Sequence, residues 1–169
     1  MRRLLFAAIT LFIAVFAAHA EVGDRHVEPS GGYALRAPKG WQFREFPGLK
    51  YQVAFLAMPG GFSPNLNVVD EGYGGPLKSY VDENTKVLKK TFTGFKLVKR
   101  VRFVTASGVQ GEKMITVSQQ QKTRLRQAFY FFPGRGGKYF VVTCSTPAEK
   151  GDAFDAAFDE SLKTFELVD

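Results

Sequence analysis

The chain after residue 30 begins with short apolar runs separated by glycine and proline, a pattern typical of β-strands joined by tight turns. Residues 32–37 alternate large side chains with small or polar ones and end at Pro38-Lys39-Gly40. A second alternation follows at 41–44, and further apolar runs occupy 51–58 and 66–69. Each run is bounded by residues that break strands. We therefore expect a series of short strands in this part of the chain.

The apolar spacing changes from two residues to three or four at Pro76. This spacing predicts a helix over 76–91, with proline at a position that the first helical turn tolerates. Four β-rich segments follow, the last being the most strand-like run of the sequence: 95–105, 109–120, 122–132 and 138–144. Because these segments are consecutive and closely linked, we expect an antiparallel meander.

A second helix is predicted near the C-terminus. Thr146 has the hydroxyl of an N-cap, Pro147 suits the first turn, and Glu149 stands three residues after the cap, which is the spacing of a capping box. One apolar stripe then follows at helical spacing, formed by Phe154, Phe158, Leu162 and Phe165. The stripe predicts that this helix packs on the sheet, where its phenylalanines leave water together.

The first twenty residues have the pattern of a signal peptide. A basic start at residues 1–3 precedes an apolar run over 4–18, and Ala18-His19-Ala20 has the small-x-small form of a cleavage site. A helix of this length spans about 22 Å, less than the roughly 30 Å of a bilayer core. We therefore expect cleavage after Ala20 and a periplasmic or secreted protein, the alternative being a retained membrane anchor.

The predicted organisation is a signal peptide at 1–20, an extended polar segment at 21–30 and one domain at 31–169. The composition fits a globular domain, since 45% of the 169 residues are hydrophobic, among them 17 Phe. The one cysteine, Cys144, excludes an intrachain disulfide. After the predicted cleavage the one remaining imidazole is His26, which lies in the polar segment, where we expect it to be solvated.

The order of these motifs resembles the superfamily of PsbP-like proteins, which also includes bacterial envelope proteins of the DcrB type and the Mog-type Ran-binding factor. The resemblance spans nearly all of residues 30–167 and rests on the following segments: Gly32-Tyr33-Ala34-Leu35, Pro38-Lys39-Gly40-Trp41, Asn65-Leu66-Asn67-Val68-Val69, a helix with Tyr80, Lys138-Tyr139-Phe140-Val141-Val142-Thr143, and the terminal helix. It implies an α+β fold, an α/β/α sandwich whose central antiparallel sheet of about six or more strands is flanked by helices. It also implies binding of proteins or ligands rather than catalysis. No cysteine follows the apolar run, unlike in the lipoprotein branch.

Basic residues are concentrated in the middle of the chain. Residues 86–138 hold 13 basic side chains and one acidic one, whereas 139–169 hold 2 basic and 7 acidic ones. Strict alternation puts Lys96, Arg100 and Arg102 on one face of the predicted strand at 95–105. Three further cations alternate with Leu125 along 122–132. If these two strands flank the one at 109–120, their cations could lie about 10 Å apart. These candidate partner-binding residues are Lys96, Arg100, Arg102, Lys122, Arg124 and Arg126.

The basic strands have two interpretations. They are solvated sheet faces, partly neutralised by the acidic C-terminal region, or they bind an anionic partner. Such a partner would be an acidic protein, an anionic lipid headgroup or a cell-wall polymer. Export argues against nucleic acid, although basic and aromatic residues alternate here.

No residue pattern predicts catalysis, a cofactor or a metal site. Cys144 lies in an apolar run with no nearby base, as a buried structural thiol does. Residues 134–138 resemble a phosphate loop, but Lys138 opens a strand instead of a helix. Asp152, Asp155 and Asp159 recur at helical spacing, which is typical of a solvated helix face.

The sequence therefore predicts an exported non-catalytic binding or assembly protein of the cell envelope. The first alternative is a periplasmic carrier that holds a lipid-like or apolar ligand between sheet and helix, where the phenylalanines line a cavity or pack as a core. An enzyme of unknown type is the second alternative.

Overall fold

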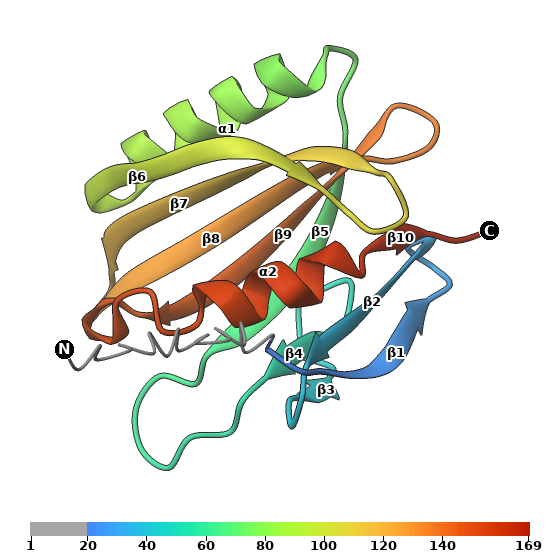
Figure 1. Ribbon diagram of the computed structural model, residues 1–169. Coiled ribbons are helices and arrows are strands. Elements are labelled where there is room, and N and C mark those ends of the chain that lie inside the picture. The colour runs from blue at the N-terminus through green and yellow to red at the C-terminus, as the bar shows by residue number, and fades with distance from the viewer. Residues whose placement is uncertain (1–19) are drawn as a thin grey trace, which may run out of the picture.

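The computed structural model describes residues 20–169, so the predicted signal peptide lies outside the described residues except for Ala20. Seven strands form an antiparallel sheet in the order β3-β4-β5-β9-β8-β7-β6. The helices α1 (Leu77–Thr91) and α2 (Asp155–Lys163) lie on its opposite faces (Figure 1). The strands are β3 (Gln42–Arg44), β4 (Val53–Phe55), β5 (Asn65–Gly72), β6 (Thr93–Val104), β7 (Gln110–Gln120), β8 (Thr123–Pro133) and β9 (Lys138–Pro147). The α+β fold predicted from the sequence is confirmed.

The meander predicted for the second half of the chain is present as β6 to β9. Each of these strands pairs with the next one along the chain. The turn before β9 uses Gly136 and Gly137, whose φ angles of 65° and 73° suit glycine. The glutamine-rich break is the turn before β8, where Gln121 has a φ of 52°. The strands lie side by side in Figure 1.

A second, smaller sheet packs on the α2 side. It consists of β1 (Val22–Glu28), β2 (Tyr33–Pro38) and β10 (Glu166–Leu167), in the order β1-β2-β10. The predicted extended segment is therefore a strand, and His26 pairs with Leu35 of β2. The His26 ring stacks on Phe43 with centroids 4.0 Å apart, and its buried Nε2 has no hydrogen-bond partner in the described part of the chain. The expectation that His26 is fully solvated is wrong, because Phe43 of β3 covers one side of its half-buried ring.

The larger core fills the space between the seven-stranded sheet, the small sheet and α2. Its phenylalanines are all at most 2% exposed: Phe132, Phe140, Phe158 and Phe165. The rings of Phe132 and Phe165 stack at 4.6 Å. Each buried phenylalanine stabilises the fold by about 1.5–3 kcal/mol. The apolar stripe thus packs on the sheet as predicted.

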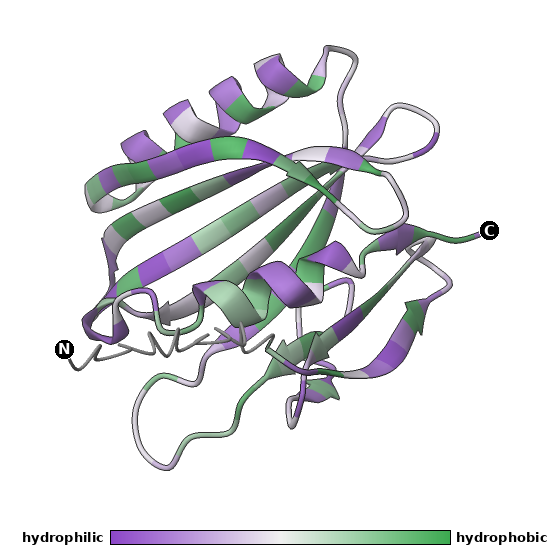
Figure 2. Cartoon of the chain, viewed as in Figure 1, coloured by the Kyte–Doolittle hydropathy of each residue, from purple (hydrophilic) through white to green (hydrophobic). Residues whose placement is uncertain are grey.

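A smaller core lies on the other face, where Tyr80 and Val81 of α1 pack against Met114, Phe129 and Phe131. Figure 2 shows the same division, since hydrophobic residues follow the sheet interior while α1 is mostly hydrophilic on its outer side. The helix therefore covers the sheet with one narrow apolar face.

The predicted start of the C-terminal helix is wrong. β9 continues through Thr146 and Pro147, which pair with Arg126 and Leu125 of β8, so their backbone groups belong to the sheet. A single 3₁₀ turn follows at Ala148–Lys150, and α2 begins at Asp155 without a side-chain cap. Thr146 is 1% exposed and is part of the strand. Pairing with β8 outweighs the capping signal.

Candidate functional site

The six predicted basic residues are divided between the two faces of the large sheet. β6 and β8 flank β7 as expected. Residues directly opposite each other in an antiparallel pair share a face. Arg100 pairs with Met114, which lies in the core under α1, whereas Arg126 pairs with Val117. Because Met114 and Val117 are three residues apart, they point to opposite faces of β7.

Irregular pairing of β6 is the physical reason for this division. The register shifts between Thr93 and Lys96 and again between Leu97 and Lys99. A bulge inserts a residue and reverses the alternation beyond it. Lys96 therefore shares the face of Val117, while Arg100 and Arg102 share the face of α1, so the expectation that these three lie on one face is wrong.

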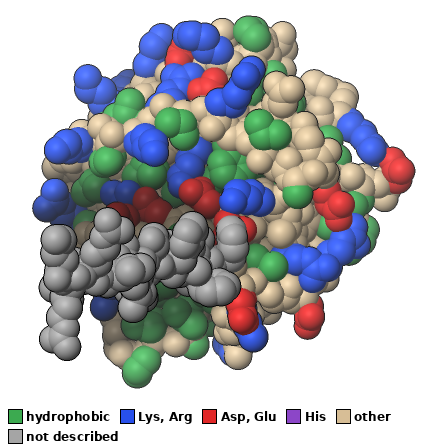
Figure 3. Space-filling model, in the orientation of Figure 1, with side chains coloured by type: hydrophobic (Ala, Val, Ile, Leu, Met, Phe, Trp, Pro, Cys, Tyr) green, Lys and Arg blue, Asp and Glu red, His purple; other side chains and the backbone are tan. Residues whose placement is uncertain are grey.

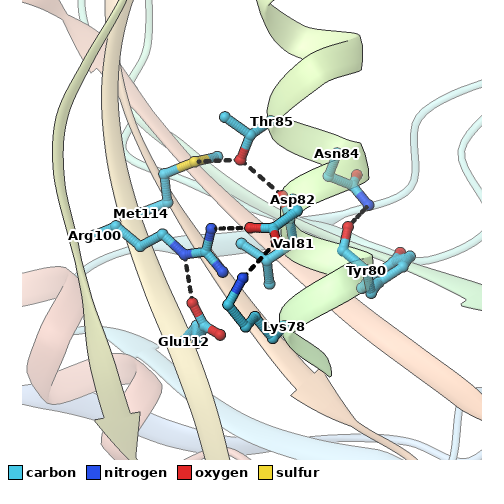
Figure 4. Close-up of polar contacts among 9 residues, drawn as sticks. All are labelled: Lys78, Tyr80, Val81, Asp82, Asn84, Thr85, Arg100, Glu112 and Met114. Carbon is cyan, nitrogen blue, oxygen red and sulfur yellow. Dashed lines mark hydrogen bonds and ion pairs between the residues drawn. The ribbon is translucent and has the colours of Figure 1, made fainter. Parts of the chain in front are cut away.

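Arg100 is held by two carboxylates between α1 and β7. Its Nη1 donates to Asp82 Oδ1 and its Nε to Glu112 Oε2, each at 2.5 Å. Asp82 also accepts from Lys78 Nζ at 2.8 Å (Figure 4). Hydrogen bonds from Lys78 and Arg100 lower the pKa of Asp82 to about 2. The charge of Arg100 is thus neutralised within the protein, where it joins helix to sheet.

Arg126 has the same kind of role on the other face. It donates two hydrogen bonds to Asp155 of α2, at 3.1 and 2.6 Å. On the same face, the buried Lys113 pairs with Asp159 of α2 at 2.6 Å. Tyr130 donates to the same Asp159 oxygen at 2.6 Å. Two of the three aspartates considered as cation ligands therefore serve to fix α2 on the sheet.

The other four predicted residues are exposed, namely Lys96, Arg102, Lys122 and Arg124. The structure adds four cations that the sequence argument did not single out, on the C-terminal half of α1 and on β6. The complete set extends over both faces of the sheet beside the β6 edge, and we call it the β6 basic surface: Lys86, Lys89, Lys90, Lys96, Lys99, Arg102, Lys122 and Arg124. None of the eight has an ion-pair partner among residues 20–169. The sequence feature that pointed to these four residues was the high density of basic residues between 86 and 138.

This surface carries a nearly unopposed positive charge. Between residues 86 and 124 the sequence has one carboxylate, Glu112, and Arg100 already binds it. Figure 3 shows basic side chains gathered over α1 and β6, with few acidic ones among them. Several cations that lack internal partners can contact the same polyanion together.

An apolar pocket lies at the other end of the sheet, over β4 and β5. It has a volume of about 550 Å³ and is lined mainly by Phe46, Leu49, Val53, Phe55 and Phe62, with Asn65 and Asn67. Phe46 and Leu49 are 44% and 46% exposed. The space between the sheet and α2, by contrast, is filled by the phenylalanine core.

The side chains considered for catalysis have structural surroundings. Cys144 is completely buried, and burial raises the pKa of its thiol. Lys138 opens β9 after a turn, as predicted, and its Nζ pairs with Asp70 at 2.8 Å. Residues 20–169 contain no group of three or more His, Cys, Asp or Glu placed to hold a metal ion. Among the same residues, no helix has the length and apolar character of a membrane span.

Comparison with known proteins finds similarity in structure only. No protein-family model and no curated protein matches the sequence. The solution structure of CyanoP, the PsbP of Synechocystis sp. PCC 6803, matches with a TM-score of 0.64 and 15% identity, over 93% of this chain and 98% of that one.

Two further solved structures share the architecture. LpqN of Mycobacterium tuberculosis, described as involved in cell envelope biogenesis, has a TM-score of 0.63 at 12% identity, over 89% of this chain and 88% of that one. The Ran-binding protein Mog1p of Saccharomyces cerevisiae has a TM-score of 0.58 at 13% identity, over 89% and 97%. The chain thus has the PsbP-like fold that its sequence resemblance implies.

Proposed function

We propose that this protein is an exported, non-catalytic binding protein of the cell envelope that recognises an anionic or protein partner through the β6 basic surface. The observation that carries the proposal is a set of eight exposed cations that have no ion-pair partner within residues 20–169. They lie on α1, on β6, in the turn before β8 and at the start of β8. Arg100 and Arg126 are left out of the binding surface because carboxylates within the protein already hold them.

The charge arrangement favours contact with a partner that carries several negative groups. The Debye length at physiological salt is about 8 Å, so exposed cations act mainly on groups that touch them. A partner with carboxylates or phosphates along its surface would contact several of the eight at once. We therefore expect binding that weakens as salt is raised.

Export is supported by the first twenty residues, which have a basic start, an apolar run and a small-x-small site. The PsbP-like fold is also found in LpqN, a protein described as involved in cell envelope biogenesis. The direct test is N-terminal sequencing of the protein from a periplasmic fraction, where we expect Glu21 as the first residue. Cytosolic protein that begins at Met1 would contradict export.

A charge-reversal experiment tests the binding surface. The triple variant Lys96→Glu, Lys99→Glu, Arg102→Glu removes three cations of the β6 basic surface. The control, Lys39→Glu, Lys150→Glu, Lys163→Glu, makes the same change in net charge at exposed positions elsewhere. In pull-downs from envelope extract at low salt, we expect the first variant to lose its partners and the control to retain them. Equal retention by both variants would remove the β6 basic surface from the proposal.

The apolar pocket favours a second candidate function, the carriage of a small apolar ligand. Its volume of about 550 Å³ lies within the range of ordinary ligand sites, and aromatic side chains make up much of its wall. Mass spectrometry of organic extracts of the purified protein would then find a bound lipid-like molecule. A Phe62→Ser variant should lose it, whereas repeated empty extracts from the unchanged protein would count against carriage.

A further inference from the structure

β6 is an edge strand that is open along its outer side. It pairs with β7 on one side, and no strand among residues 20–169 pairs with the other. Its twelve residues make it the longest strand of the sheet, and it runs along the margin beneath α1 (Figure 1). An open edge presents backbone N–H and C=O groups that can pair with another extended chain.

The second half of β6 is regular enough to accept such a chain. Both register shifts lie before Lys99, and from Lys99 to Val104 each residue pairs in sequence with residues 115 to 110 of β7. In an antiparallel pair, alternate residues direct their backbone groups away from the neighbour. A regular stretch of this length extends for roughly 20 Å, which is a normal length for a strand.

The side chains along this edge define the chemistry of the chain that would fit. Apolar side chains are unusually exposed here: Leu97 by 43%, Val98 by 47%, Val101 by 37% and Val104 by 47%. Lys96, Lys99 and Arg102 are exposed between them. Directly opposite side chains on neighbouring strands interact, and opposite charges stabilise the pair. Lys99 and Arg102 are three residues apart, so they point to opposite faces of the sheet. A strand with an acidic residue at every third position and apolar residues between would place a carboxylate on each face.

The same charges disfavour a second copy of this protein at the edge. Pairing β6 with another β6 would bring lysines and arginines together, and like charges directly opposite each other are destabilising. Edge lysines are a common means by which proteins prevent such self-association. The occupant favoured by the structure is therefore acidic and comes from a different protein.

We infer that β6 binds an extended acidic segment of a partner protein, which adds to the sheet as a further antiparallel strand along residues 99–104. This inference rests on the proposed function and specifies how the partner is held. Backbone hydrogen bonds to β6 provide the pairing, and Lys96, Lys99 and Arg102 select for acidic side chains. Arg100 is not needed for contact, since Asp82 and Glu112 bind it.

The test uses two synthetic peptides in which glutamate recurs at every third position among valines, so that glutamates face both sides and valine amides point to both edges. They carry the same charge, but in the second the valine amides are N-methylated, which removes their hydrogen bonds and leaves the carboxylates unchanged. We expect the unmethylated peptide to bind at least about tenfold more tightly, because several backbone hydrogen bonds are lost in the other. Amide hydrogen exchange should slow at residues 99–104 when that peptide binds.

Charge variants of the full domain complete the test. Lys99→Glu, Arg102→Glu should weaken peptide binding by about tenfold or more, while Lys39→Glu, Lys150→Glu should leave it unchanged. Equal affinity for the two peptides would overturn strand addition and leave the β6 basic surface as a purely electrostatic site. Retention on anionic vesicles without peptide binding would also overturn it and would assign the surface to headgroups. If the charge variant Lys99→Glu, Arg102→Glu still binds both the peptide and the anionic vesicles, the proposed function itself would be contradicted.

Discussion

Arg126 of β8 forms a two-pronged ion pair with Asp155, the first residue of α2, and so joins the sheet to the helix. Two nitrogens of the guanidinium donate to the two carboxylate oxygens, at 3.1 and 2.6 Å. The side chains are 16% and 22% exposed. Paired hydrogen bonds between charged groups fix orientation as well as distance. The start of α2 is therefore positioned by a residue that the sequence pattern had placed on a binding surface.

Replacing Arg126 should destabilise the domain much more than replacing its neighbour Arg124. Arg126→Gln leaves Asp155 without its cation, and we expect a loss of about 1.5–3 kcal/mol in the free energy of unfolding. Arg124→Gln changes an exposed residue that has no ion pair with any described residue, so its effect should stay below about 0.5 kcal/mol. Urea unfolding of both variants measures the difference. Equal losses would show that the Arg126 contact adds no stability.

The buried Lys113 should make Asp159 indispensable unless the lysine is also replaced. The Lys113 side chain is 7% exposed and pairs with Asp159 at 2.6 Å. Asp159→Asn leaves a buried ammonium without a counter-charge, which should cost about 2–4 kcal/mol. The double variant Lys113→Met, Asp159→Asn removes that charge and should recover part of the loss. A double variant less stable than Asp159→Asn in urea unfolding would contradict this explanation.

Asp70 should contribute to unfolding in acid. Burial would raise the pKa of this carboxyl, but hydrogen bonds from Lys138 and Lys50 outweigh burial and lower its pKa from 3.8 to about 2. A lowered pKa gives stability that is complete above the unfolded value and is lost as pH falls. The shift corresponds to about 2 kcal/mol, lost between pH 3.8 and about 2.

The measurement is urea unfolding over this pH range for the unchanged protein and for Asp70→Asn. The variant should be less stable at neutral pH and should lose less stability on acidification. Asp24→Asn, at an exposed carboxylate of β1, is the matched control and should follow the unchanged protein. A variant as sensitive to acid as the unchanged protein would assign the acid response to other groups.

His26 should make the domain less stable below neutral pH. Burial lowers the pKa of its imidazole from 6.5, and Glu28 partly opposes this shift. The unfolded chain therefore binds the proton at a higher pH than the folded one does, so stability falls as pH drops through 6.5. His26→Phe keeps an aromatic ring against Phe43 and removes the proton. Chemical unfolding at several pH values should show a flatter profile for this variant.

The fold was predictable because hydrophobic periodicity is set by burial, which dominates the energetics of the strands and of α1. The run from Phe95 to Cys144 alternates strongly enough to predict the meander. The start of α2 was not predictable, since Thr146 and Pro147 carry a helix signal and the ladder with β8 overrides it. The capping pattern has no information about the neighbouring strand.

The candidate site was predictable in composition but not in geometry. The excess of basic residues between 86 and 138 is a sequence property, and it remains on the surface of α1 and β6. The register shift between Leu97 and Lys99 reverses the alternation of β6 between Lys96 and Arg100, and no glycine or proline at that point signals it. The partners of Arg100 and Arg126 lie on other elements, so only the folded chain shows that these two cations are already bound.

The small sheet links the two ends of the described chain. β2 pairs with β1 on one side and with β10 on the other, and Val168 donates a backbone hydrogen bond to Gly32. This sheet is therefore incomplete until residues 166–168 are available. A chain that emerges from a ribosome or a translocation channel with its N-terminus first acquires its final strand last. The β1–β2 hairpin therefore completes its sheet only after synthesis has reached residue 168, although its own two strands are made first.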